Sequence, residues 1–237
     1  MNVNELKKNA AEKAVEEITD GMIIGLGTGS TFQFALEKIA QRIKDGELKN
    51  IVGVCSSERT RLESLRLGIP ITTLNELYQN SKNDSQLLID VTIDGADEVD
   101  EHLNLIKGGG GALLGEKIIV QATKKFIVIV DEGKISKTLG TNFAVPIEVL
   151  KKVEDVEKKY LQSLGAVVNK RMNNLVEYIT DEDNLILDAK FDSISDVEKL
   201  SSLLNKRAGI VEHGIFEKEY VTKVISAGKE KVSIIEK

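Results

Sequence analysis

The stretch that decides the fold runs from Leu87 to Ile119 and reads LLIDVTIDGADEVDEHLNLIKGGGGALLGEKII. It opens with an apolar, β-rich segment, 87–93, which predicts a buried strand. Asp94 and Asp97 follow this segment directly. Because ligands bind at the carboxyl ends of the strands in parallel α/β sheets, these two acids predict a functional site.

The second half of the stretch adds a cation and a glycine-rich segment. Lys107 precedes four glycines, Gly108–Gly111, and a helix-like segment carrying Glu116 follows. Consecutive glycines lose more conformational entropy on folding than other residues, and they allow the backbone to approach a ligand closely. Each residue alone also fits a plain turn or a solvated loop. Their combination within about thirty residues favours a binding or catalytic site.

An earlier segment, 25–31, reads GLGTGST between a predicted strand at 22–26 and a predicted helix. It lacks the Gly-Lys-Ser/Thr of a nucleotide P-loop, and Ser30 stands where a dinucleotide fingerprint has its third glycine. The loop amides, including that of Gly29, and the hydroxyls of Thr28, Ser30 and Thr31 therefore predict a site for a small phosphate. A tight strand–helix turn without a ligand is the structural alternative.

The predicted elements indicate two domains. Residues 1–134 alternate strand and helix, which predicts a Rossmann-like parallel sheet covered by helices. A β-α-β-β-β-α order follows between 146 and 204, typical of a small α+β, ferredoxin-like domain. Short apolar segments at 210–211, 221–225 and 232–235 are expected to rejoin the first sheet. The prediction is an α/β protein with a Rossmann-like catalytic domain, 1–145 plus 208–237, and an inserted small α+β domain, 146–207.

Composition excludes several function classes. The 237 residues carry a net charge of −6, which argues against a broad nucleic-acid-binding face. A single cysteine, Cys55, excludes an internal disulfide, and two histidines leave few ligands for a transition metal. No apolar run is long enough for a membrane span, and the N-terminus lacks the apolar core of a signal peptide. We therefore expect a cytoplasmic protein that binds no metal, no membrane and no nucleic acid.

Carboxylates, lysines and a phosphate loop suit proton transfer on a phosphorylated metabolite. Aldose–ketose isomerisation needs a base at carbon, a cation for the enediolate oxygen, and an acid or base that opens the sugar ring. The candidates are Asp94, Asp97, Glu116, Lys107 and Lys134, the last of which follows a strand predicted at 126–130. An exposed loop lysine is the alternative for Lys134, and the pattern alone does not assign the carbon base.

The sequence resembles the type A family of ribose-5-phosphate isomerases. Eight segments carry the resemblance in order along nearly the full chain: Glu5–Lys8, GTGST (27–31), SSERT (56–60), DGADEVD (94–100), KGGGGALLGEKI (107–118), DEGK (131–134), VPIEV (145–149) and GIVEHGIF (209–216). The resemblance implies interconversion of ribose 5-phosphate and ribulose 5-phosphate without metal or cofactor. It also implies a Rossmann-like domain with a small α+β domain, and a homodimer or homotetramer.

The resemblance assigns roles to individual residues. Glu116 would be the general base that moves the proton between C1 and C2, and Lys107 would stabilise the enediolate. Asp94 would assist ring opening, with Asp97 beside it. Substrate contacts would come from these residues and from the remaining motif positions, Lys7, Thr28, Gly29, Ser30, Thr31, Gly95, Ala96, Gly108, Gly109, Gly110 and Lys134. His213 would have no catalytic role.

Two departures and three alternatives accompany this prediction. Lys206–Ala208 stands where the family often has a proline, and Gly115 replaces a longer polar residue, which we expect to loosen the helix turn carrying Glu116. A sugar-phosphate sensor would normally add a DNA-binding module, for which no residues are left over. An acyl-CoA transferase would form a thioester on Glu116. A sugar-phosphate deaminase would need a histidine-assisted site, for which His102 is a poor match.

Overall fold

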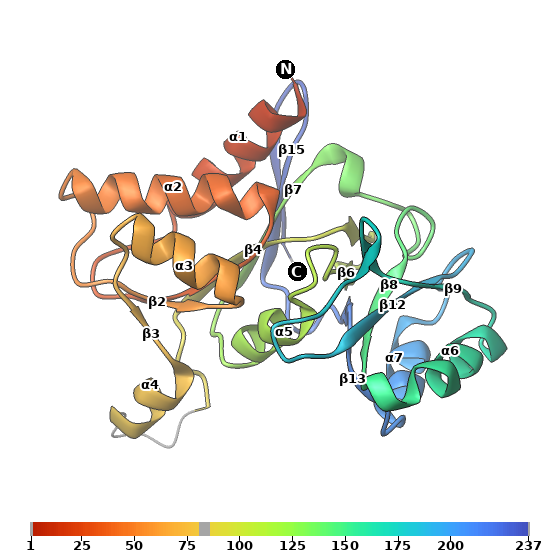
Figure 1. The fold of residues 1–237 in the computed structure, drawn as a ribbon. Helices are drawn as coiled ribbons and strands as arrows, with labels where there is room; N and C mark the ends of the chain where they lie inside the picture. Colours follow the sequence, from red (N-terminus) through yellow and green to blue (C-terminus); the bar gives the residue numbers. More distant parts are fainter. Residues whose placement is uncertain (1, 81–85, 237) are drawn as a thin grey trace. The chain divides into compact units, whose positions relative to one another are not determined.

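The computed structural model describes residues 2–80 and 86–236 (Figure 1). Seven strands form the large sheet in the order β16-β15-β7-β4-β1-β2-β3, and all neighbours are parallel except β15 and β16. The strands are β1 (Ile23–Leu26), β2 (Val52–Cys55), β3 (Ile71–Thr72), β4 (Val91–Gly95), β7 (Phe126–Asp131), β15 (Lys223–Ala227) and β16 (Val232–Glu236). The chain reverses its direction of travel across the sheet between β1 and β4, where open α/β sheets bind ligands.

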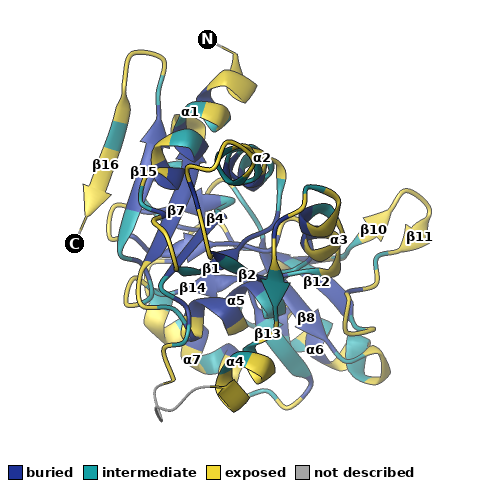
Figure 2. Cartoon of the chain, turned by 90° about the vertical axis from the view of Figure 1, so that its left-hand side faces the viewer, coloured by how far each residue is buried: buried dark blue, intermediate teal, exposed yellow. Residues whose placement is uncertain are grey.

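Helices cover both faces of the large sheet. On one face, α1 (Val3–Val15) and α2 (Ser30–Lys44) pack together over a core that includes Ile24 and Leu26. On the other face, a smaller cluster joins Ile23 to residues of α4 (Leu74–Asn80) and α5 (Leu113–Gln121). Side chains alternate between the two faces of a strand, so β1 has apolar residues on both. Figure 2 shows the central strands buried and β16 largely exposed.

The second sheet has the ferredoxin-like order β13-β8-β12-β9. Its elements follow the chain as β-α-β-β-α-β: β8 (Val145–Val149), α6 (Glu154–Ser163), β9 (Val167–Lys170), β12 (Leu185–Lys190), α7 (Val197–Asn205) and β13 (Ile210–His213). Their inward side chains form a separate apolar core. The predicted placement of 210–211 in the first sheet was wrong, because β13 pairs with β8. One of the three consecutive strands expected between 146 and 204 is instead an exposed hairpin, β10 (Met172–Asn173) and β11 (Val176–Glu177).

Backbone contacts divide the chain into two compact units. The first contains residues 1–95, 115–133 and 219–237, and the second contains residues 96–114 and 134–218. The second unit also holds a three-stranded sheet of β5 (Glu98–Val99), β6 (Leu105–Ile106) and β14 (Ile215–Phe216). These strands are too short to give a recognisable pattern in the sequence. The division into domains 1–145 plus 208–237 and 146–207 stays a prediction, and the contacts group 96–114, 134–145 and 208–218 with the ferredoxin-like elements.

The remaining helical elements of the described chain are short. Helix α3 (Glu58–Arg66) follows β2, and the 3₁₀ turns η1 (Glu132–Lys134) and η2 (Lys151–Val153) follow β7 and β8. Within residues 2–80 and 86–236, no helix combines the length and the apolar character that crossing a membrane requires.

Glu148 on β8 is a buried carboxyl whose ionisation opposes folding. Its Oε1 accepts hydrogen bonds from Thr180 Oγ1 and Asn184 Nδ2, both at 2.9 Å. Burial raises the pKa of Glu148 above its ordinary value of 4.5, although these two hydrogen bonds lower it. A raised folded-state pKa gives stability that is complete below the ordinary value and is lost as pH rises through the folded value.

We predict that Glu148→Gln removes this pH-dependent loss, because glutamine keeps the Oε1 acceptor but cannot ionise. Relative to the wild type, the variant should gain unfolding free energy as the pH rises from 4 to 8. Urea denaturation across this range is the measurement, with the exposed Glu101→Gln as control. The same pH dependence in wild type and Glu148→Gln would contradict the prediction.

Candidate active site

The Asp94 carboxylate is buried at the carboxyl end of β4 and faces the loop that follows β1. Its Oδ1 accepts hydrogen bonds from the N–H of Thr28 at 3.0 Å and from the N–H of Gly95 at 2.7 Å. A β-carbon at Gly27 would overlap this carboxyl group. Glycine is therefore required at position 27 for the carboxylate to lie against the loop.

Three hydroxyl groups surround that of Thr28 in the first unit. Thr28 Oγ1 lies 2.8 Å from Ser56 Oγ, 2.7 Å from Ser57 Oγ and 3.1 Å from Thr60 Oγ1. Thr60 also donates its hydroxyl to the Gly27 carbonyl at 2.8 Å. Ser57 accepts from the Thr60 N–H and caps α3. The hydroxyl cluster Thr28, Ser56, Ser57 and Thr60 thus fixes the loop from the side of the SSERT motif.

The N-terminus of α2 combines three features that favour an anion. Gly29 occupies the N-cap position with a φ of 115°, a conformation that favours glycine, and it has no side chain to bond the first N–H groups. Lys7 Nζ on α1 donates to Ser30 Oγ at 2.9 Å, and Thr31 follows in the first turn. A cation, hydroxyls and a helix N-terminus are the usual surroundings of a bound phosphate.

Glu116 lies on α5 and is 3% exposed. The preceding Gly115 is pressed against the chain that follows β2, since a β-carbon there would overlap the backbone carbonyl oxygen of Ser56. The expectation that Gly115 loosens this turn is therefore replaced by a packing role. Its missing side chain lets the helix carrying Glu116 approach the residue whose hydroxyl contacts Thr28.

Lys107 is almost fully buried in the second unit, at 2% exposure. Its Nζ lies 5.5 Å from the centre of the Phe216 ring, and its N–H donates to the Gly214 carbonyl at 2.8 Å. Phe216 ends the GIVEHGIF motif, and no local sequence pattern predicts that it lies beside Lys107. The attraction between an ammonium group and an aromatic face offsets part of the cost of burying the charge.

Asp97 and the glycine segment are in direct contact. Asp97 Oδ2 accepts a hydrogen bond from the Gly109 N–H at 2.7 Å, and a β-carbon at Gly109 would overlap the Asp97 carboxyl. Gly108 has a φ of 94°, in the region that favours glycine. Asp97 of the DGAD motif is thus in direct contact with the KGGG segment.

Lys134 ends the turn η1, with its Nζ 5.8 Å from the centre of the Phe143 ring. The segment carrying Phe143 is held by Glu98, a fully buried residue that the sequence analysis did not single out. Its carboxylate accepts from the N–H groups of Gly140, Asn142 and Phe143 and from the hydroxyl of Thr141, at 2.9–3.2 Å. Glu98 therefore orders the loop whose aromatic ring faces Lys134.

The histidine and cysteine residues considered in the sequence, His213 and Cys55, are both at least partly buried. His213 is buried, and its ring nitrogens contact Asn205 Oδ1 at 3.2 Å and the Ile215 N–H at 3.3 Å. Cys55 is partly buried, and burial raises the pKa of its thiol. Among residues 2–80 and 86–236, no group of three or more histidine, cysteine or acidic residues is arranged to hold a metal ion.

The predicted site residues divide between the two units. The first unit contains Lys7, Thr28, Gly29, Ser30, Thr31, Asp94, Gly95 and Glu116, and the second contains Ala96, Asp97, Lys107, Gly108, Gly109, Gly110 and Lys134. The chain passes between units at 95/96, 114/115, 133/134 and 218/219. The first three of these crossings lie within two residues of a predicted site residue, so three of the four connecting segments belong to the site motifs.

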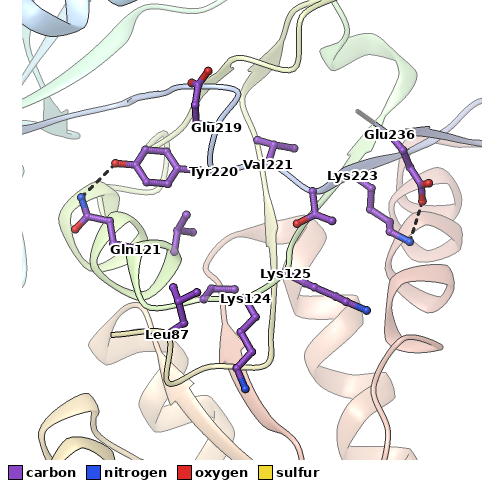
Figure 3. A pocket seen from close by; sticks show the side chains of 12 residues that line it. Leu87, Gln121, Lys124, Lys125, Glu219, Tyr220, Val221, Lys223 and Glu236 are labelled. Atoms are coloured by element: carbon purple, nitrogen blue, oxygen red, sulfur yellow. Dashed lines mark hydrogen bonds and ion pairs between the residues drawn. The ribbon is translucent and has the colours of Figure 1, made fainter. Parts of the chain in front are cut away.

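A cavity of about 730 Å³ lies elsewhere in the first unit (Figure 3). Its wall includes Lys125 and Lys223, beside the amino ends of β7 and β15, together with Gln121 and Tyr220, which are hydrogen-bonded at 3.4 Å. Asp94 stands at the carboxyl end of β4, which runs parallel to β7. This cavity therefore lies at the amino ends of the strands, and Asp94 lies at their carboxyl ends. A second cavity, of about 560 Å³, is lined by Gly29, Thr60 and neighbouring residues of α2 and α3.

We predict that Gly115→Ala destabilises the protein, although alanine normally favours a helix. The added methyl group must displace the Ser56 backbone or α5, which should lower the unfolding free energy by about 1–3 kcal/mol. Urea denaturation measures the change. Ile118→Ala, on an exposed position of the same helix, is the control and should have a smaller effect. A Gly115→Ala protein as stable as the wild type would show that the contact can relax without loss.

Comparisons with known proteins identify the family of this chain. The family model for ribose 5-phosphate isomerase A (phosphoriboisomerase A) matches residues 52–231. The ribose-5-phosphate isomerase A of Desulfatibacillum aliphaticivorans is 53% identical over 212 residues, covering 89% of this chain and 88% of that protein. Its counterpart from Streptococcus agalactiae is 42% identical over 235 residues, covering 99% of this chain and 100% of that protein.

Solved structures give the same result. A D-ribose-5-phosphate isomerase in complex with phospho-erythronic acid superposes with a TM-score of 0.93 at 41% identity, with full coverage of both chains. The ribose 5-phosphate isomerase of Plasmodium falciparum has a TM-score of 0.91 at 37% identity, covering 99% of each chain. This chain belongs to the ribose 5-phosphate isomerase A family.

Proposed function

We propose that this protein interconverts D-ribose 5-phosphate and D-ribulose 5-phosphate through an enediolate, as a step of the non-oxidative pentose phosphate pathway. The observation that supports the proposal most directly is the burial of Glu116 and Lys107, each at most 3% exposed, in the motifs that the family shares. Keeping an ionisable group away from water is unfavourable unless the group is paired or functional. A base and a cation are the two groups that enediolate chemistry requires.

In the proposed reaction, Glu116 removes the proton from C2 of the open-chain aldose and returns it to C1. The carbonyl oxygen at C1 becomes the enediolate oxygen, and Lys107 stabilises its negative charge. Because Lys107 lies on the face of Phe216 and is shielded from water, its charge acts at a lower effective dielectric than in solution. The O2 hydroxyl loses its proton as the ketone forms, and O1 gains one.

The other residues would hold substrate and assist ring opening. Asp94 lies beside the Thr28–Thr31 loop, which suits transfer of a hydroxyl proton during ring opening, with Asp97 as its neighbour in sequence. The Lys7–Ser30 pair and the N-terminus of α2 would bind the phosphate, and Lys134 would contact the substrate. The backbone of Gly95, Ala96 and Gly108–Gly110 would complete the binding surface.

The first experiment is conversion of ribose 5-phosphate to ribulose 5-phosphate by the purified protein in the presence of EDTA. We expect full activity, and we expect Glu116→Gln to lower kcat by about two orders of magnitude or more, the scale of a lost general base. Binding of phospho-erythronic acid, which a related isomerase holds in its structure, should change little. Glu177→Gln, an exposed glutamate on β11, is the matched control.

Each departure from this result has a defined meaning. Near-normal turnover by Glu116→Gln would show that another carboxylate is the base. Activity that EDTA removes would show that a metal takes part. A wild-type protein that binds the sugar phosphate without turning it over would favour the sensor alternative over the isomerase.

Replacing Lys107 tests the proposed cation. Lys107→Met fills the same buried space without the charge, so kcat should fall more than ground-state binding weakens, because the charge on the enediolate develops during the reaction. Steady-state kinetics separate the two effects. If only KM changes, Lys107 serves binding alone.

The same proposal extends to the state of the protein in the cell. We propose a homodimer or homotetramer that acts in the cytoplasm on a free sugar phosphate and engages no nucleic acid. The single cysteine is compatible with a reducing compartment, and the net charge of −6 is unfavourable for contact with a polyanion.

A further inference from the structure

The glycine segment of the second unit is held by two side chains from the β10–β11 hairpin. Arg171, which precedes β10, donates from Nη1 to the Gly108 carbonyl at 2.7 Å and to the Gly109 carbonyl at 3.2 Å. Tyr178, which follows β11, donates its hydroxyl to the Gly110 carbonyl at 3.0 Å. Three consecutive carbonyl groups therefore bind to one hairpin.

Arg171 is itself firmly oriented. Its Nε donates to Asp188 Oδ2 at 2.9 Å and its Nη2 to Asp188 Oδ1, so the guanidinium group is fixed by a bidentate pair with β12. Its own N–H donates to the Ile186 carbonyl at 2.8 Å. Bidentate arginine–carboxylate pairs hold both partners in a defined plane. Strand β12 of the four-stranded sheet therefore fixes the position of Arg171 Nη1, the donor that faces Gly108 and Gly109.

The planar peptide bond transmits this constraint to Asp97. In a trans peptide the C=O and the following N–H point in opposite directions. The carbonyl of Gly108 binds Arg171 on one side, and the N–H of Gly109 binds Asp97 Oδ2 at 2.7 Å on the other. The Gly108–Gly109 peptide is held at both ends, and its orientation determines where the Asp97 carboxylate lies.

We infer that Arg171 and Tyr178 are positioning residues for the isomerase reaction, which fix the glycine segment and, through the Gly109 N–H, the Asp97 carboxylate. This inference rests on the proposed function. Four glycines in sequence have wide conformational freedom, so the segment needs external contacts to keep one geometry. Gly109 and Gly110 are exposed, so packing in a core does not fix them. The hydrogen bonds from the hairpin supply the external contacts to their carbonyl groups.

The test compares conservative variants with matched controls in the same unit. Tyr160 also donates its hydroxyl to a backbone carbonyl, that of Leu203 at 3.3 Å, and Arg207 also forms a bidentate pair, with Glu157 at 2.9 and 3.0 Å. Neither residue contacts the glycine segment. Tyr160→Phe and Arg207→Lys therefore report what loss of such contacts does to the fold alone.

We expect Tyr178→Phe to lower kcat about tenfold and Arg171→Lys about a hundredfold, because small displacements of reacting groups reduce turnover on this scale. KM should also rise, because Gly108–Gly110 belong to the proposed binding surface, but by a smaller factor than the fall in kcat. Amide hydrogen exchange at residues 109–111 should become faster in both variants and stay unchanged in both controls.

Two results would overturn the positioning role: kcat in Tyr178→Phe and Arg171→Lys equal to that of their controls, or unchanged exchange at residues 109–111. A wild type that converts no ribose 5-phosphate would overturn the proposed function instead. Hydrogen exchange, which needs no turnover, would still decide whether the hairpin orders the glycine segment.

Discussion

The contact on which the first unit depends is the one between the Asp94 carboxylate and the loop after β1. Two backbone N–H groups bind this carboxylate at the point where the strand order of the sheet reverses. The arrangement needs a glycine at position 27, a parallel pairing of β1 with β4, and the hydroxyl cluster that supports the loop from behind. The fold thus places an acid beside the N-terminus of α2, where an anion is favoured.

In the second unit, the main constraint is the ordering of the glycine segment, Gly108–Gly111. The glycines that follow Lys107 have little conformational preference of their own, and they are fixed by contacts from Asp97 and from the hairpin. Lys107 is held by the Gly214 carbonyl and the Phe216 ring, which come from a distant part of the chain. Buried polar groups that are fully bonded give a defined geometry rather than much net stability.

Much of this was predictable from local pattern. The strand ends, the glycine segment and the GTGST loop each have a short-range signal, so the Rossmann-like sheet followed from the sequence, and the same signals selected the candidate site residues. What failed depended on pairing between distant residues. The β13 strand joined β8 instead of the first sheet, Glu98 bound a loop more than forty residues away, and Gly115 served close packing instead of flexibility. In each case the sequence around a residue contains no pattern that identifies its distant partner.

The hydroxyl cluster around Thr28 has a consequence for the positions of its own protons. A hydroxyl group has one proton and two lone pairs, and Thr28 lies within hydrogen-bonding distance of three other hydroxyl oxygens. Since Thr60 donates to the Gly27 carbonyl, it accepts within the cluster, while Thr28 and Ser56 can exchange the roles of donor and acceptor. Rotation of protons alone can therefore change which hydroxyl donates within the cluster, with every heavy atom in place.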